Sequence, residues 1–255
     1  MNFFKPLFFT LCASSGLSAV AADFSFDRPG TGFGTGITPV GQLAWEQGLP
    51  AATYSEQATA QGKVKSLALN ADALFRTGLT PSMELQLGWQ GPSWSKTKSR
   101  GHSEEESGLG DVSIGIKKLI DLQDDRLTWA VLAQAQIATG NEGFSAEEDI
   151  YTLGSTLDFQ YNDDLNTSLT MFYEVQDGDW SVTAVPTLSY KIAGNWSGFS
   201  EFVYSKKESS DYEYRLGTGL MYAVNERTQL DASIGVELSD PNRAYSAGLG
   251  LAYLF

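Results

Sequence analysis

The sequence ends on RAYSAGLGLAYLF (residues 243–255), and this stretch decides the fold. Successive side chains of a β-strand point to opposite faces, so the stretch has two faces of different character. One face is apolar with aromatic side chains, and it comprises Tyr245, Ala247, Leu249, Leu251, Tyr253 and Phe255. The opposite face carries mostly small residues. This profile is typical of a transmembrane β-strand, although the last core strand of a soluble β-sandwich also alternates in this way.

The last residue, Phe255, follows the apolar strand without a polar tail. This ending resembles the C-terminal signature of bacterial outer-membrane barrels, in which a terminal Phe and alternating hydrophobic residues form the strand that the assembly machinery recognises. The resemblance implies that Tyr253 and Phe255 are the assembly signal and that the barrel-assembly machinery is a partner.

The N-terminus has the features of a secretory signal peptide, which we place at residues 1–22. Lys5 supplies the positive charge, residues 6–20 form a short apolar region, and Ala19-Val20-Ala21-Ala22 offers a cleavage site. The single cysteine, Cys12, lies inside this segment and lacks the context of a lipoprotein signal. The mature chain is therefore expected to be cysteine-free, which excludes a disulfide framework and any thiolate metal site or nucleophile.

The composition is that of an acidic β-protein. The formal net charge is −14 and becomes −15 when Lys5 is removed, so the surface is not expected to bind nucleic acid or bare anionic lipid. The chain contains 26 Gly, 11 Tyr, 6 Trp and 14 Phe, whereas a disordered acidic protein would lack aromatic residues. Beyond the signal peptide, no run of about 18 apolar residues predicts a helical span.

Residues 40–255 read as a succession of alternating segments, of which Met83–Gln90 (MELQLGWQ) is a clean example. We count about twelve such strands, an even number as single-chain bacterial barrels require. Residues 91–107 are expected to form a long polar loop. Short and longer connections alternate along the chain, as periplasmic turns and extracellular loops do, and both termini then fall on the periplasmic side. The fold class predicted is an all-β, transmembrane, antiparallel up-and-down barrel.

The segment that precedes the barrel, residues 23–39, is Gly-rich and weakly periodic. Two interpretations stay open for it. It can be a first irregular strand, or it can be a lead-in that is tucked into the lumen as a plug.

Charged side chains sort to the lumen of a barrel, because a charge on the lipid face costs about 2–4 kcal/mol at mid-bilayer. The strand alternation predicts these lumen-facing candidates: Glu46, Asp72, Arg76, Glu84, Asp111, Lys117, Asp158, Glu174, Lys191, Glu201, Arg215, Asp231 and Glu237. Acids outnumber bases in this set. The set fits a conduit that favours cations or neutral polar solutes, and it equally fits an ion-paired network that fills a narrow barrel.

Enzymatic and metal-binding functions find little support. The only histidine, His102, lies in the polar loop beside Ser103, and the two would point apart in an extended segment. The acidic runs 104–106 and 147–149 can hold Ca²⁺ or bridge divalent ions to lipopolysaccharide, and Lys96, Lys98 and Arg100 can touch headgroup phosphates, but such runs are usually solvated. We predict no catalytic residue, no cofactor and no metal site.

Several stretches together resemble one family. They are Asp27–Gly30 (DRPG), Arg76–Thr80 (RTGLT) leading into Met83–Leu85 (MEL), Gly108–Lys117 (GLGDVSIGIK) and Ala138–Gly140 (ATG). The similarity is to the outer-membrane β-barrel "transporter" family named for the meta-pathway of phenol degradation, and it covers nearly the whole mature chain. It implies a porin-like barrel, sometimes linked to uptake of aromatic compounds. We expect Gly108, Gly110 and Gly115 to allow close packing inside the barrel, and Asp111 and Lys117 to pair across the lumen.

The function expected is that of a channel or transporter in the outer membrane of a Gram-negative bacterium. Small polar or aromatic solutes would pass passively through a mildly acidic lumen, and the outer surface would contact outer-membrane lipid and lipopolysaccharide. The alternative is a non-conducting structural or adhesive barrel, and an outer-membrane hydrolase is a weaker third.

Overall fold

The computed structural model describes residues 24–59, 62–239 and 243–255, so the expected signal peptide lies outside the described residues. Every regular element in the described residues is a β-strand. The strands are β1 (Leu43–Gly48), β2 (Ala51–Thr59), β3 (Gly62–Asn70), β4 (Ala73–Thr80), β5 (Met83–Trp89), β6 (Pro92–Ser99), β7 (His102–Leu109), β8 (Val112–Ile120), β9 (Leu127–Ile137), β10 (Ile150–Asn162), β11 (Leu165–Gln176), β12 (Asp179–Ala193), β13 (Trp196–Lys207), β14 (Tyr212–Asn225), β15 (Thr228–Glu237) and β16 (Arg243–Leu254).

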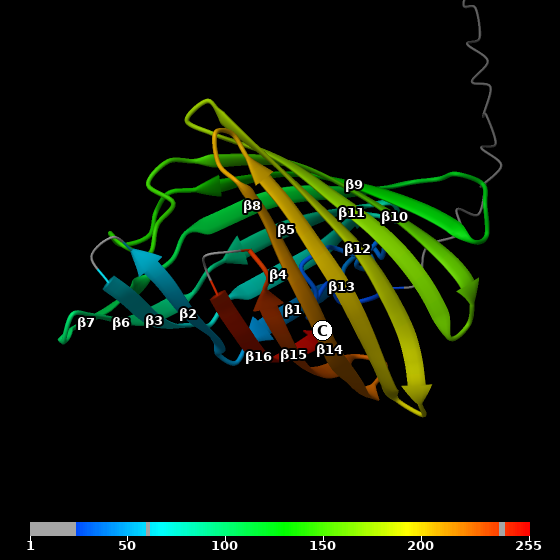
Figure 1. The fold of residues 1–255 in the computed structure, drawn as a ribbon. Coiled ribbons are helices and arrows are strands. Elements are labelled where there is room, and N and C mark those ends of the chain that lie inside the picture. Colours follow the sequence, from blue (N-terminus) through cyan, green and yellow to red (C-terminus); the bar gives the residue numbers. More distant parts are fainter. Residues whose placement is uncertain (1–23, 60–61, 240–242) are drawn as a thin grey trace, which may run out of the picture.

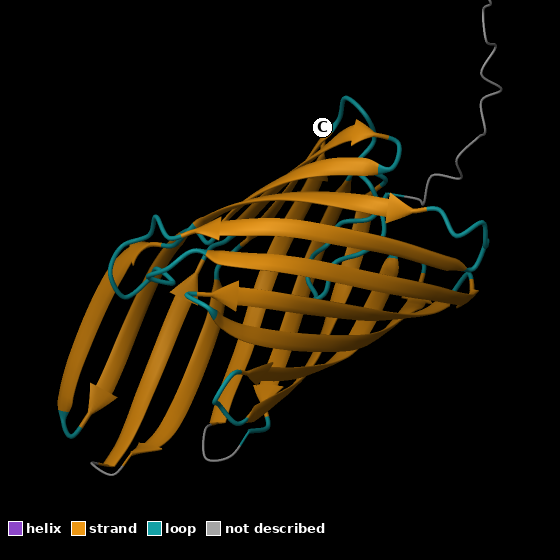
Figure 2. Ribbon diagram, turned by 90° about the horizontal axis from the view of Figure 1, so that it is seen from above, coloured by secondary structure: helices purple, strands orange, loops and turns teal. Residues whose placement is uncertain are grey.

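The strands close into an antiparallel barrel (Figures 1 and 2). The ring runs β1-β4-β5-β8-β9 and on in chain order to β16, which pairs with β1. Twelve strands therefore form the closed wall, as the sequence predicts. The C-terminal strand is central to the closure, because β16 pairs with β1 at its last residues and with β2 near its start.

The first four crossings of the wall are each broken into two strands, whose outer halves β2, β3, β6 and β7 branch from β16 as a four-stranded sheet, the outer flap. The breaks are aligned and still hydrogen-bonded: Gly48 N donates to Asp72 O at 2.8 Å, and Gly110 N donates to Gly91 O at 2.9 Å. Gly91 has φ +74°, and a Cβ there would lie 1.8 Å from the Ala71 carbonyl oxygen, so this bend requires glycine.

The loop expected at residues 91–107 is wrong, because β6 and β7 form a hairpin there. Both faces of the hairpin carry polar side chains, Lys and Ser with one Glu on one face and Ser, Thr and Glu on the other, so hydrophobic alternation gives no signal for these strands.

The distribution of side chains is inverted relative to a soluble protein. Large apolar side chains lie on the outer surface, with Leu153 and Ile234 each 63% exposed, whereas Arg76, Lys117, Glu46 and Glu84 are fully buried inside. This inversion is what a barrel wall in lipid requires, because apolar residues face the acyl chains and charges face the lumen. No helix in the described part of the chain has the length and apolar character that a membrane span needs.

Polar residues on the outer face have partners within the wall. Trp129 Nε1 donates to Ser155 Oγ at 2.9 Å, and the Ser200 and Thr218 hydroxyls lie 3.3 Å apart. Pro186 has no N–H, and the β12–β13 ladder is interrupted at Val185 and Pro186. The hydroxyl groups of Ser155, Ser200 and Thr218 therefore have hydrogen-bond partners on the lipid side, and Pro186 lies where the strand ladder has a gap.

Candidate functional site

The candidate site is the lumen and the segment that crosses it, residues 24–40, which we call the lumen segment. It lies inside the barrel (Figure 2), and its residues contact the wall at several points around the circumference. Arg28 contacts β1 and β15, Thr31 contacts β13 and β14, Phe33 contacts β11, and Thr38 contacts β5. The segment has no strand of its own, so its conformation is set by these contacts.

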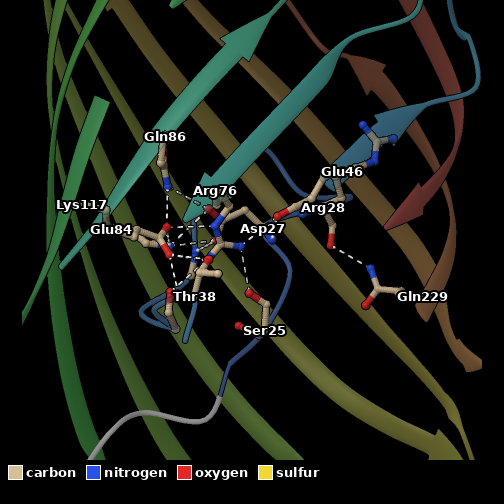
Figure 3. A network of polar contacts seen from close by, with 12 residues as sticks. Ser25, Asp27, Arg28, Thr38, Glu46, Arg76, Glu84, Gln86, Lys117 and Gln229 are labelled. Carbon is tan, nitrogen blue, oxygen red and sulfur yellow. Dashed lines mark hydrogen bonds and ion pairs between the residues drawn. The ribbon is translucent and has the colours of Figure 1, made fainter. Parts of the chain in front are cut away.

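The strongest anchor is the guanidinium of Arg76 on β4, which is fully buried (Figure 3). Arg76 donates to Glu46 Oε1 and to Glu84 Oε1, each at 2.8 Å. Its remaining donors reach the carbonyl oxygens of Ser25 and Gly36, each at 2.9 Å. Arg76 therefore ties two places in the lumen segment to two carboxylates of the wall.

The wall carboxylates bind the backbone of the lumen segment directly. Glu84 accepts from the Thr38 amide at 2.6 Å and from its hydroxyl at 2.9 Å. Glu46 accepts from the amides of Asp27 and Arg28 at 3.1 and 2.8 Å. Charge-assisted bonds to backbone N–H groups are among the stronger ones in proteins, so these carboxylates fix the path of the segment.

Lys117 on β8 completes the buried cluster. Its ammonium lies 3.0 Å from Glu84 Oε1 and 3.3 Å from Asp27 Oδ2. Three cations of the lumen, Arg28, Arg76 and Lys117, thus face carboxylates from both the wall and the lumen segment. Removing one partner of such a buried cluster typically costs about 3–5 kcal/mol, because the remaining charge is left uncompensated.

Arg28 forms a second anchor near the C-terminal strand. It donates to Asp72 at 3.1 Å and to Asp231 at 3.4 Å, and its carbonyl accepts from Gln229 at 3.3 Å. A Cβ on Gly250 would lie 2.5 Å from Arg28 Nε. The space left by this glycine in β16 is therefore occupied by Arg28.

The opposite wall holds the segment with fewer charges. Glu201 on β13 accepts from the Thr31 amide at 2.9 Å and from the Thr31 hydroxyl, which also accepts from Arg215. Phe33 lies with its ring centroid 5.7 Å from that of Phe172. The contacts on this side are hydroxyl and aromatic contacts, with a single acid and a single base.

Two cavities remain beside the lumen segment. The larger, about 770 Å³, is lined by residues 25–30 and 32–36 and by the turns at residues 162–165 and 194–198, and it contains Asp158 and Lys191. The smaller, about 280 Å³, lies against Thr31 and Phe172 and contains Glu174. The lumen segment thus leaves open space beside it, lined by both polar and apolar side chains.

Asp111 has a different role from the one expected. It does not pair with Lys117; its carboxylate instead accepts from Gly140 N, Ser145 Oγ and Ala146 N, each at 2.8 Å. Asp111 lies between β7 and β8, outside the strands. Burial acts to raise its pKa, but the hydrogen bonds outweigh burial and lower the pKa below the ordinary aspartate value. The carboxylate therefore holds the loop of residues 138–149 in place.

Two glycines of the family stretches, Gly108 and Gly140, serve this loop contact. A Cβ on Gly108 would lie 2.6 Å from the Phe144 ring, and one on Gly140 would lie 2.7 Å from the Leu109 carbonyl oxygen. The β7–β8 junction and residues 138–149 therefore pack closely against each other. At Gly108 the packing is against the loop and not inside the barrel as expected, whereas a Cβ on Gly115 would lie 3.3 Å from Leu132 Cδ1, within the barrel.

The remaining candidates have few or exposed contacts. Asp158 accepts from Asn166 at 3.1 Å, Glu174 accepts from Ser181 at 3.1 Å, and Lys191 lies 3.9 Å from Asp164 at an exposed position. Glu237 accepts from the Ser239 hydroxyl at 2.6 Å. These side chains are not part of the buried cluster.

Two important residues, Asp27 and Arg28, were missed among the predicted lumen residues. They are the only charges between residues 24 and 40. This isolated pair in a Gly-rich stretch was the available signal, because such a stretch offers few other side chains to anchor it.

The described residues give no support to metal binding. His102 is exposed at the start of β7, and no group of three or more His, Cys, Asp or Glu in the described residues is arranged to hold a metal ion.

Comparisons with known proteins agree with this architecture. No curated protein matches the chain. The COG4313 outer membrane channel from Pseudomonas putida F1 is 13% identical with a TM-score of 0.65, covering 85% of this chain and 96% of that one. The KdgM porin in complex with disordered oligogalacturonate is 12% identical, TM-score 0.51, over 80% and 98% of the two chains. The TodX deltaS2S3 mutant monoaromatic hydrocarbon channel is 9% identical, TM-score 0.51, over 85% and 90%.

At these identities the likeness shows the fold and not the solute. These three structures are porins and channels, and the fold that they share with this chain is the outer-membrane barrel, which places this protein in the bacterial outer membrane. A family model described as "Putative MetA-pathway of phenol degradation" matches residues 26–255, which is almost the entire described chain. The protein therefore belongs to this family of outer-membrane β-barrels.

Proposed function

We propose that this protein is a narrow passive channel for small polar or aromatic solutes, with a mildly cation-favouring lumen. The observation that carries the proposal is the incomplete filling of the barrel. The lumen segment crosses the interior, yet cavities of about 770 and 280 Å³, lined by both polar and apolar side chains, lie beside it. A fully packed structural barrel would leave no such space.

The acidic character of the lumen follows from which charged side chains are paired with one another and which face the cavities. Arg28, Arg76 and Lys117 are neutralised within the buried cluster, which holds more acids than bases. In the cavities Asp158, Glu174 and Glu201 outnumber Lys191. Rings of carboxylates favour cations in a pore. The Phe33 and Phe172 rings supply an apolar contact that an aromatic solute can use.

Bilayer conductance tests the channel directly. The purified protein in a planar bilayer should give small, passive currents with a reversal potential that favours cations in a salt gradient. Deleting residues 24–37 should raise the conductance several-fold, because the constriction is removed. A reversal potential that favours anions, or a deletion that leaves the conductance unchanged, would contradict the proposal.

The solute class needs a separate measurement. Liposome swelling with small neutral sugars and with aromatic acids should show uptake of molecules that fit beside the lumen segment and exclusion of larger oligosaccharides. If neither class enters, the non-conducting structural or adhesive barrel becomes the better function. The extensive buried cluster around Arg76 is the observation that favours that alternative.

We also propose two partners on the outside of the barrel. Lipopolysaccharide would contact the outer surface, and the assembly machinery would recognise β16 through Tyr253 and Phe255, whose rings lie 4.8 Å apart at the end of the strand. Phe255→Ala should lower the yield of heat-modifiable protein in the outer membrane, while the same variant refolded from urea should close normally.

A further inference from the structure

Five cations gather on the outward face of the outer flap and its neighbour β16. The strand pairing places them together: Lys65 is directly opposite Lys98, and Glu56 lies between Lys65 and Arg243. Lys63 and Lys96 lie two residues from Lys65 and Lys98, so alternation puts them on the same face. We call Lys63, Lys65, Lys96, Lys98 and Arg243 the cationic patch.

The patch carries net positive charge on a strongly acidic protein. Among the residues that the structure describes, only two acids share its face, and both are already engaged: Glu56 lies 2.9 Å from Lys65 Nζ, and Glu105 bonds to Lys96. Lys98 and Arg243 form no ion pair with any residue that the structure describes. Lys98 and Arg243 are therefore available to bind an anionic ligand.

The direct opposition of Lys65 and Lys98 is unfavourable by itself. Like charges at opposite positions of an antiparallel pair destabilise the sheet. An anion that lies over the two ammonium groups would reverse the sign of this interaction, because each Nζ offers up to three donors.

The position of the patch along the strands identifies the anion. On β2, β6 and β16 the outward side chains nearer the barrel are the aromatic residues Tyr54, Trp94 and Tyr245, and the cations follow further out. Aromatic side chains mark the interface between acyl chains and headgroups in membrane barrels. Groups just beyond them therefore lie at the depth of the lipid phosphates.

The sequence places this end of the barrel outside the cell, because both chain termini are expected at the opposite, periplasmic end. The outer flap in Figure 1 extends from the barrel on the side away from the C-terminus of β16. The lipid whose phosphates meet this face is the phosphorylated glycolipid of the outer leaflet.

We propose that the cationic patch binds the phosphate groups of lipid A, with Lys98 and Arg243 as the principal contacts and Lys65 and Lys96 supporting them. The inference rests on the lipopolysaccharide contact proposed above and assigns it to one side of the barrel. It does not depend on whether the lumen conducts.

The other side of the barrel lacks such a patch. At the outer ends of β13 and β14 the outward cation is Lys206, which donates to the Ser210 carbonyl and lies 4.7 Å from the Tyr212 ring centroid. Its neighbour Lys207 alternates to the inward face. Binding is thus one-sided, and the flap side is the side that would hold a defined lipid.

Lipid A binding to the full mature chain in a neutral detergent tests the proposal. Native mass spectrometry should show retention of bis-phosphorylated lipid A by the wild type, and little retention of dephosphorylated lipid A. The double variant Lys98→Glu/Arg243→Glu should bind lipid A at least tenfold more weakly. Lys98→Gln/Arg243→Gln should lie between the two, because it removes charge without adding repulsion.

A matched control carries the same change in net charge elsewhere. Lys207→Glu/Arg227→Glu alters the inward face of β13 and the turn between β14 and β15, and it should bind lipid A as the wild type does. Gel migration before and after boiling checks that every variant forms a closed barrel. Bilayer conductance of the Lys98/Arg243 variants should equal that of the wild type, so a failed channel and a failed lipid site give different results.

Three results would overturn the proposal. The first is equal affinity of the wild type and the Lys98→Glu/Arg243→Glu variant for lipid A. The second is equally strong binding of dephosphorylated lipid A, which would show that the acyl chains suffice. The third is equally strong binding of phosphatidylglycerol, which would show a general attraction for anionic lipid.

Discussion

The two sides of the lumen use their charges differently. On the side formed by β1, β4, β5 and β8, Arg76, Lys117, Glu46 and Glu84 are fully buried and bonded to one another or to the lumen segment. On the side formed by β10 to β14, Glu201 and Arg215 contact Thr31 of the lumen segment, whereas Glu174 is bonded only to the hydroxyls of the neighbouring strands. The lumen therefore has an anchoring wall and an open wall.

This difference separates stability from conduction. A carboxylate that is saturated by guanidinium and backbone donors has no capacity left for a passing ion, whereas a carboxylate bonded to hydroxyls retains it. The anchoring wall should decide whether the lumen segment stays in place, and the open wall should decide what passes beside it. The predictions below test this division.

The largest effect is expected from Arg76→Met. The change leaves Glu46 and Glu84 without their shared cation and releases the Ser25 and Gly36 carbonyls, so unfolding should become easier by about 3–5 kcal/mol. The urea midpoint of heat-modifiable migration measures this loss. Arg215→Met on the open wall is the control, and it should cost clearly less. Equal losses in the two variants would remove the distinction between the walls.

Replacing one acid on each wall by glutamine should give a smaller difference in stability between the two walls. Glu84→Gln removes the charge that compensates both Arg76 and Lys117, and about 2–4 kcal/mol of stability should be lost. Glu174→Gln should leave stability within about 0.5 kcal/mol and should shift the reversal potential toward zero selectivity. Urea midpoints of both variants measure the loss of stability, and bilayer recordings measure the change in ion selectivity. The division fails if Glu84→Gln alters selectivity more than stability.

We expect the order of the loop that Asp111 holds, residues 138–149, to depend on pH. Because the pKa of Asp111 is lowered in the folded protein, its contribution is complete above the ordinary aspartate range and is lost as the pH falls through the lowered value. Residues 138–149 should then become accessible to an acid-active protease while the barrel stays closed. Asp111→Asn should produce the same accessibility at neutral pH, at a cost of about 1–3 kcal/mol for the unsatisfied donors. Protection of the loop at all pH values in the variant would contradict this role.

The barrel could be predicted from the sequence because lipid enforces the alternation. A charge on the outward face is costly in lipid, so polar residues alternate with apolar ones. In segments such as Met83–Gln90 this alternation predicts both the strand and the side chains that face the lumen. The hairpin at β6 and β7 could not be predicted, because an exposed flap needs no apolar face.

A place in the lumen was one of the two interpretations open for residues 23–39, but the path of the segment could not be predicted, for a different reason. Its path depends on hydrogen bonds to residues far away in the chain, such as Thr31 to Glu201 and Thr38 to Glu84. A Gly-rich stretch has no periodicity that could encode these partners. The pairing of Asp111 with Lys117 was wrong for the same reason, because Asp111 is satisfied by a loop that lies some 30 residues further along the chain.

The smallest effect concerns two glycines of the C-terminal strand. A Cβ at position 250 would meet Arg28 and Asp231 at 2.5 Å, whereas at position 248 the nearest atom, Ser233 Oγ, is 3.4 Å away. Gly250→Ala should therefore displace Arg28 and cost about 1 kcal/mol. Gly248→Ala should be neutral or slightly stabilising, since alanine loses less chain entropy than glycine in a strand. Urea midpoints of the two variants give the comparison within one strand. Equal midpoints would mean that Arg28 does not fill the space at Gly250, and that the lumen segment is held by Arg76 and its carboxylates alone.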